Sequence, residues 1–225
     1  MKMRCGISLH IKCDYGTWGD FLFREYVPFF EAQGIELVFI SNAVEDVAGY
    51  IRDMRLDGII LSGGNDVIPD KKNKENLMAT LLRNVQEKKI LAASIASKLP
   101  VLGICRGMQF INYYFGGNIT AGMTGHVKVV HPLIIKDAAL LALTGKSRLV
   151  VNSYHRQGVL EETLSPFLRP AAVSGDGLVE ALYHPGLPVF GMQWHPERKG
   201  GDAAAYKAIA KAFRLGKFYW GEKLR

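Results

Sequence analysis

The stretch Gly103-Ile104-Cys105-Arg106-Gly107 decides the fold, because it sets a cysteine between two glycines where an apolar run meets a helix-like segment. The run Val101–Ile104 predicts a buried strand, and Met108–Phe115 predicts the helix that follows it. A sharp strand-to-helix turn strains its central residue, and flanking glycines remove the side chains that would collide there. The pattern therefore predicts a nucleophile elbow after a central strand, with Cys105 at a helix N-terminus.

On either side of this turn, apolar runs alternate with segments of helical period, which is typical of an α/β protein with a mainly parallel sheet flanked by helices. In the first half we expect strand, helix, strand, helix, strand and helix, at Arg4–Leu9, Phe21–Gln33, Glu36–Ile40, Val44–Met54, Gly58–Leu61 and Glu75–Lys98. In the second half we expect sheet-edge strands and hairpins and then a closing helix, at His126–Lys136, Arg148–Ser153, Leu178–Tyr183, Val189–Gln193 and Ala203–Leu215. No linker or charged tail divides the chain, so we expect one domain over residues 1–225.

Composition excludes several classes of protein. Of 225 residues, 48% are hydrophobic and 22% are charged, which suits a packed core and excludes a chain disordered by charge. The longest apolar runs are far shorter than the ~18 residues of a membrane span, so no membrane partner is expected. Three cysteines without a CxxC pair argue against a disulfide framework and a cysteine-rich zinc module. No secretory signal is visible, so we expect a cytoplasmic location.

The formal net charge of +7 raises the question of a nucleic-acid partner. The basic residues are scattered, apart from Lys71–Lys74 and Lys217–Arg225, and neither run matches a nucleic-acid fold signature. We therefore expect no nucleic-acid partner. The charge either belongs to a solvated face or attracts a small anionic substrate, for which Lys71 and Lys72 are the candidate contacts.

Cys105 has the setting of a reactive thiol, because the dipole and free N–H groups of a helix N-terminus favour the thiolate. A structural cysteine, the alternative, would not need two flanking glycines, whereas a structural role suits Cys5 and Cys13. A thiolate that cleaves an amide needs a proton donor and a group that orients the donor. His195 and Glu197 meet both needs, because side chains two apart on extended chain share a face. The alternatives are a surface turn or a metal site, and we expect neither a metal nor a cofactor.

A glycine-rich turn, Ser62-Gly63-Gly64-Asn65-Asp66, ends the neighbouring strand. Backbone N–H groups stabilise an oxyanion only when no side chain intervenes, so the amides of Gly64 and Arg106 are the candidate oxyanion hole. Taken alone, a Gly-Gly pair is equally compatible with an ordinary tight turn. Its position beside an elbow favours the functional interpretation.

With these motifs, the chain resembles the class I glutamine amidotransferase-like superfamily, whose fold is flavodoxin-like. Within that superfamily, it is similar to the γ-glutamyl-γ-aminobutyrate hydrolase-like family. Four ordered motifs carry the resemblance: Leu61–Val67, Gly103–Gln109, Val151–Gln157 and Gly191–Glu197. The resemblance implies a triad of Cys105, His195 and Glu197 and an oxyanion hole from Gly64 and Arg106. It also implies that four residues hold the α-amino and α-carboxylate groups of a small-molecule γ-glutamyl substrate: Gln109, Ser153, Tyr154 and His155.

The resemblance implies a hydrolase that cleaves a γ-glutamyl amide through a thioester and releases glutamate. The segment 126–132 is similar to a bacterial branch associated with surface polysaccharide synthesis, which extends the expectation to a nucleotide-linked γ-glutamyl amidate. The alternative is a glutaminase subunit that passes ammonia to a synthetase partner, although Met108 replaces the histidine common in amidotransferases. A non-enzymatic binding protein is the third alternative. The sequence is also compatible with a homodimer. The segment after Val67 is short for the family, which leaves the leaving group undetermined.

Overall fold

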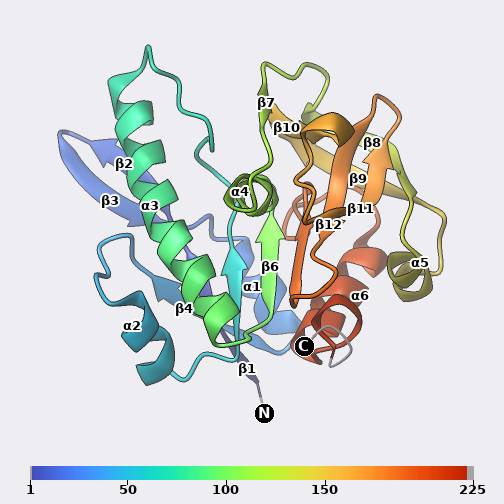
Figure 1. Ribbon diagram of the computed structural model, residues 1–225, viewed down its shortest axis with the longest axis horizontal. Coiled ribbons are helices and arrows are strands. Elements are labelled where there is room, and N and C mark those ends of the chain that lie inside the picture. Colours follow the sequence, from blue (N-terminus) through green and yellow to red (C-terminus); the bar gives the residue numbers. More distant parts are fainter. Residues whose placement is uncertain (1, 222–225) are drawn as a thin grey trace.

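The protein, described over residues 2–221 by a computed structural model, is built on one mixed β-sheet (Figure 1). In spatial order, the main path of hydrogen-bonded strands is β4 (Ile35–Ile40), β1 (Met3–Ser8), β5 (Gly58–Leu61), β6 (Val101–Ile104), β13 (Val189–Met192), β12 (Leu178–Tyr183), β11 (Arg169–Ser174), β8 (Val127–Ile135) and β9 (Arg148–Tyr154). Pairs from β4 to β13 are parallel, and pairs from β13 to β9 are antiparallel. The predicted α/β fold with its parallel sheet is confirmed, and an antiparallel wing extends it.

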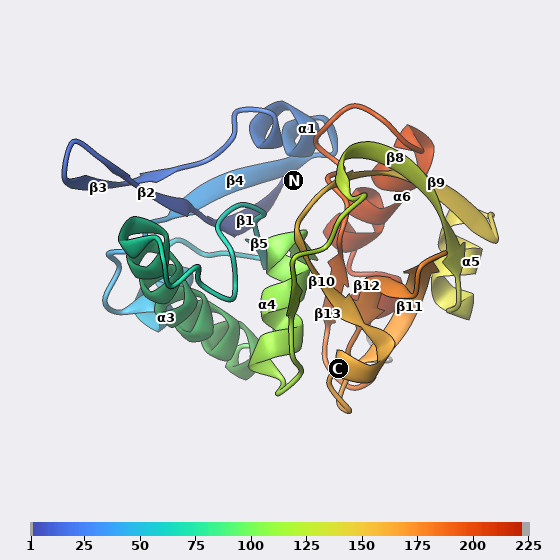
Figure 2. The same cartoon turned by 90° about the horizontal axis from the view of Figure 1, so that it is seen from above.

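Helices cover both faces of the parallel strands (Figure 2). One face carries α2 (Val47–Asp53), α3 (Lys74–Ala96) and α4 (Arg106–Tyr114), and the other carries α1 (Tyr26–Ala32) and α6 (Ala203–Arg214). Each face has its own apolar core, so Ile59 and Leu61 of β5 pack into one and Ile60 into the other. A strand that is buried on both faces appears in the sequence as a continuous apolar run, and this is why β5 could be predicted.

Shorter elements complete the fold: the hairpin of β2 (His10–Asp14) and β3 (Thr17–Phe21), the strands β7 (Thr120–Ala121) and β10 (Gln157–Leu160), the helix α5 (Ala138–Thr144) and the 3₁₀ turns Glu161–Thr163 and Phe218–Trp220. The hairpin extends from the sheet edge (Figure 1). Within residues 2–221, no helix is long and apolar enough to cross a membrane.

The helix expected over Phe21–Gln33 is wrong in its first part. Thr17–Phe21 pairs with His10–Asp14 as a hairpin strand, and the helix begins only at Tyr26. Pro28 explains the late start, because a proline ring clashes with the carbonyl four residues earlier and is tolerated only in a first helical turn. The helix therefore cannot extend back to Phe21.

The placement of Val189–Gln193 among the edge strands is also wrong. β13 lies inside the sheet, parallel to β6 on one side and antiparallel to β12 on the other. All four of its residues are buried. This position matters for the site, because Met192 pairs in register with Ile104, so the residues that follow both strands meet at the same sheet edge.

Candidate active site

The elbow after β6 has the predicted strained geometry. Cys105 has φ 52° and ψ −106°, a conformation that side-chain-bearing residues rarely adopt. A Cβ added at Gly103 would lie 2.7 Å from the carbonyl carbon of Gly107, and one added at Gly107 would lie 2.1 Å from the carbonyl oxygen of Leu61. Both flanking positions therefore require glycine, because backbone atoms that cannot move aside occupy the space of a side chain.

His195 and Glu197 follow β13 and reach the thiol from the neighbouring strand. His195 Nδ1 lies 2.6 Å from Glu197 Oε1, and the imidazole is close enough to Cys105 for the charge of its thiolate to act on it. Burial by itself lowers the pKa of His195, but the charges of Cys105 and Glu197 outweigh burial and raise that pKa to about 9. The imidazole is thus protonated at neutral pH and sits between the thiol and a buried carboxylate.

Two residues that the sequence analysis gave no role hold this group in place. The His195 amide donates to Asn152 Oδ1 at 2.9 Å, and Asn152 Nδ2 donates to the His195 carbonyl at 2.8 Å. Gln193 Nε2 lies 3.4 Å from Cys105 Sγ. Both residues belong to the motifs that carry the family resemblance, which was the available signal.

The residues of the candidate oxyanion hole, Gly64 and Arg106, line the same pocket as Cys105 and His195. The amide of Gly63 donates to the Tyr26 hydroxyl at 3.0 Å, whereas the next amide, that of Gly64, has no hydrogen-bond partner in the described part of the chain. Gly64 has φ +108°, and a Cβ there would lie 2.0 Å from His10 Cε1. Arg106 is the first residue of α4, so its N–H is among those that an α-helix leaves without an internal partner.

A buried ionic network lies beneath the turn and the elbow. The Glu87 carboxylate binds the guanidinium groups of Arg83 and Arg106, and all three side chains have exposures of 0 to 1%. Arg83 donates to the carbonyls of Ser62 and Gly63 at 2.8 and 3.0 Å. Burial raises the pKa of Glu87, but the two arginines outweigh it and hold that pKa below its usual range. The network therefore fixes the glycine turn against the elbow through one carboxylate.

A pocket of about 370 Å³ opens over Cys105 and His195. Its lining includes the oxyanion-hole candidates Gly64 and Arg106 and three of the expected substrate contacts, Gln109, Tyr154 and His155. The other lining residues are Asn65, Asp66, Ala121, Gly122, Arg156, Gln157 and Arg198. The described basic side chains at its wall thus include Arg156 and Arg198, whereas Lys71 and Lys72, the residues expected there, lie outside the lining.

Ser153 does not reach the pocket. Alternation along β9 directs Asn152 toward His195 and Tyr154 into the pocket, so the side chain between them points to the other side. Ser153 Oγ donates to the His126 carbonyl at 2.9 Å. The expected substrate contact from its hydroxyl is therefore not supported.

Gln109 and His155 line the pocket, and some of their polar atoms already form hydrogen bonds within the protein. Gln109 Nε2 donates to the Gln157 carbonyl and to Gln193 Oε1, at 2.6 and 3.1 Å. Its remaining group is the acceptor oxygen. His155 Nδ1 lies 2.9 Å from the Gln157 carbonyl, and its Nε2 faces Glu180 at 3.6 Å. His155 thus stands between the pocket and a second polar cluster, of His126, His131 and Glu180, that the sequence analysis did not foresee.

Comparison with known proteins places this geometry in context. Residues 18–197 match the family model described as Peptidase C26. The γ-glutamyl-CDP-amidate hydrolase of Campylobacter jejuni is 27% identical over 89% of this chain and 88% of its own length. One subunit of the glutamine-hydrolysing GMP synthase of Thermococcus kodakarensis is 31% identical over 73% of this chain and 77% of its own length.

A solved structure agrees with the fold. A GMP synthase subunit from Thermoplasma acidophilum, itself described as putative, superposes with a TM-score of 0.69 at 18% identity, covering 96% of this chain and 98% of that one. The relatives thus include both a γ-glutamyl amide hydrolase and a glutamine amidotransferase subunit, and the shared fold is that of the class I amidotransferases.

Proposed function

Because the chain belongs to the Peptidase C26 family, we propose that it is a cysteine-dependent hydrolase that cleaves a γ-glutamyl amide and releases glutamate. The observation that carries the proposal is the convergence of Cys105, His195 and Glu197 beneath one pocket. The amides of Gly64 and Arg106 supply the complementary donors. A strained thiol between a protonated imidazole and two free N–H groups is suited to acyl transfer.

In the proposed reaction, the Cys105 thiolate attacks the γ-carbonyl carbon, and the oxygen takes up negative charge beside the amides of Gly64 and Arg106. As the C–N bond breaks, the His195 imidazolium gives its proton to the leaving nitrogen. The γ-glutamyl thioester remains. Neutral His195 then takes a proton from water, which attacks the thioester carbonyl, and the C–S bond breaks to yield glutamate and the thiolate. Glu197 keeps the imidazole oriented throughout and stabilises its charge.

Polar groups around the pocket match the α-amino acid end of a γ-glutamyl substrate. The free Gln109 oxygen accepts from the α-ammonium group, since its amide nitrogen is already bonded. Arg198 supplies a cation for the α-carboxylate. Its guanidinium carbon lies 4.6 Å from the centre of the Tyr154 ring and 5.1 Å from that of Phe23, so the two rings hold it at the pocket wall.

The proposed leaving group is anionic. Arg156 adds positive charge to the pocket wall beyond the Arg198 charge assigned to the α-carboxylate, and the Campylobacter jejuni relative is a γ-glutamyl-CDP-amidate hydrolase. Met108, in the position where amidotransferases commonly carry histidine, favours a hydrolase over a glutaminase subunit. A γ-glutamyl-linked nucleotide amidate is therefore the preferred substrate class.

The test is a mass-spectrometric assay of purified protein against glutamine, γ-glutamyl-aminobutyrate and γ-glutamyl nucleotide amidates. We expect glutamate release from at least one of them, fastest from an anionic amidate, and none above background from Cys105→Ala. Release at equal rates by both proteins would refute the hydrolase proposal. Ammonia formation from glutamine only in the presence of an added synthetase would favour the glutaminase subunit.

A further inference from the structure

A buried carboxylate without hydrogen-bond partners lies beside the pocket, on β12. Glu180 is fully buried, and neither of its carboxylate oxygens has a hydrogen-bond partner in the described part of the chain. A buried ionised carboxylate is costly unless a positive charge or several donors compensate it. No lysine or arginine is paired with it among the ion pairs of residues 2–221, so its nearest partners there are the imidazoles of His131 and His155.

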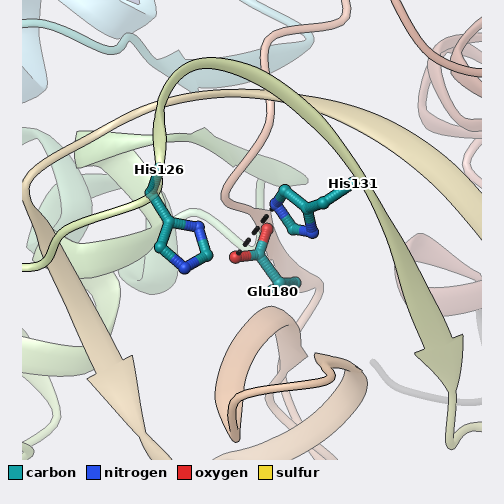
Figure 3. A group of neighbouring side chains, drawn as sticks. All are labelled: His126, His131 and Glu180. Atoms are coloured by element: carbon teal, nitrogen blue, oxygen red, sulfur yellow. Dashed lines mark ion pairs between the residues drawn. The ribbon is translucent and has the colours of Figure 1, made fainter.

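Imidazole rings surround this carboxylate (Figure 3). His131 Nε2 lies 4.0 Å from Glu180 Oε1, and His155 Nε2 lies 3.6 Å from the same oxygen. Both of these ring nitrogens are buried without a hydrogen-bond partner in the described residues. The ring centre of His126 lies 5.1 Å from that of His131 and 4.8 Å from that of His155. Four polar groups therefore converge on one small volume.

The outer nitrogens of two of these rings already have partners among the described residues. His126 Nε2 lies 2.8 Å from the Asp176 carboxylate and so carries the hydrogen that this contact needs. His155 Nδ1 donates to the Gln157 carbonyl in the same way. The inner nitrogen of His155 faces the Glu180 carboxylate without a hydrogen-bond partner in the described residues, and that of His126 lies 3.4 Å from Ser153 Oγ. A cation bound between these groups would supply the charge compensation that a buried carboxylate needs.

We propose that His126, His131 and Glu180 bind a divalent transition-metal ion of the zinc class. Two imidazoles and one carboxylate are a ligand set that Zn²⁺ uses. One ligand atom from each residue lies within 4.8 Å of the other two, so the three must move closer together to reach the roughly 3.3 Å expected between ligands of a tetrahedral site. His131, 17% exposed, has room for that movement. Asp176 is the outer carboxylate that commonly orients a ligating histidine.

The ion would join strands that the sheet itself does not pair. Glu180 is on β12 and His131 on β8, and β11 lies between these two strands. His155, which contacts the same carboxylate, also lines the pocket over Cys105. Metal binding would thus fix one wall of that pocket. The proposal concerns this cluster alone and does not depend on the hydrolase reaction.

The test is titration of the full chain with Zn²⁺ by isothermal calorimetry and thermal melting. All titrations use a background protein that carries Cys105→Ala, because Cys105 and His195 would otherwise bind zinc themselves. We expect one equivalent of Zn²⁺ per chain and a rise in melting temperature. His131→Gln, at a partly exposed position, should lower the affinity by about 100-fold or more. Asp176→Asn, an outer-shell change, should lower it by about 10- to 100-fold.

His184→Gln is the matched control, since His184 lies outside the cluster against Phe115, and it should bind zinc like the background. Equal affinity in His131→Gln and His184→Gln would overturn the proposal. So would a background protein that binds no stoichiometric Zn²⁺ and melts at an unchanged temperature. Because His131 is partly exposed, we expect His131→Gln to fold normally, and circular dichroism checks that it does. A loss of zinc binding in this variant then reports on the site itself.

Discussion

Replacement of Glu87 by glutamine tests whether one buried carboxylate holds the turn and elbow together. The carboxylate is fully buried between Arg83 and Arg106, and it also accepts from Ser8 Oγ at 2.7 Å. Glu87→Gln keeps the shape of the side chain but leaves two buried guanidinium groups without an anion. Breaking a buried ion pair in this way costs about 3–5 kcal/mol. For a chain of this size, that corresponds to a fall in melting temperature of about 6–20 °C.

The same variant should be less active, because Arg106 also supplies an amide to the proposed oxyanion hole. Loss of one such donor lowers kcat by about 10²–10³-fold, which sets the upper limit of the effect. The pH dependence has a definite sign. Since the folded-state pKa of Glu87 lies below its usual range, its stabilisation is present at neutral pH and is lost as the pH falls through that lowered pKa.

Chemical denaturation with a matched surface control decides the question. Glu36 pairs with Arg4 at 3.7 Å, and these side chains are 52% and 39% exposed. Glu36→Gln should therefore change the free energy of unfolding by less than about 1 kcal/mol. A free energy of unfolding for Glu87→Gln within about 1 kcal/mol of the wild-type value would show that the network does not hold the turn against the elbow.

Three further predictions concern the proposed reaction. Iodoacetamide should label Cys105 with loss of activity and spare Cys5, because burial raises the pKa of the Cys5 thiol; labelling of Cys5 first would contradict this. Activity should fall as the pH rises through about 9, where His195 loses its proton. The stability that this proton contributes is complete below about pH 6.5 and should be lost as the pH rises through about 9. An activity profile that stays flat to pH 10 would exclude a protonated His195 paired with Glu197. Arg198→Gln should raise KM for an anionic γ-glutamyl substrate more than Lys72→Gln does, with a gap that shrinks in added salt; equal KM changes would remove Arg198 from substrate binding.

The elements that carry the elbow could be predicted because their signals are local. Gly58–Leu61 and Val101–Ile104 match the structure residue for residue, since each is an apolar run closed by turn residues. Cys105, His195 and Glu197 were found by the same means, from glycine spacing and an extended His-Pro-Glu. The hairpin at residues 10–21 was missed because its second strand, Thr17–Phe21, is exposed along its whole length and so lacks the alternation of buried and exposed residues that marks a strand.

Other features depend on packing that sequence spacing does not show. Arg83 and Glu87 have the i, i+4 spacing of an ordinary surface pair, and only the contact of α3 with the elbow makes them buried partners of Arg106. Glu180 lies far along the chain from His126 and His131. Strands that are not paired neighbours bring them together, so no local pattern could signal the cluster.

The reversal of strand direction between β13 and β12 separates the part of the pocket that carries the thiol and the imidazole from the part that the antiparallel strands supply. The thiol, the imidazole and the glycine turn all follow parallel strands, whose ends the sheet holds at fixed spacing. Tyr154, His155 and Arg156 come instead from the antiparallel wing. Changes in the loop after Tyr154, which carries His155 and Arg156, can therefore alter the pocket wall without moving the strands that precede the thiol and the imidazole. A lineage could diversify its substrates by rebuilding one half of the pocket while the other half is inherited unchanged.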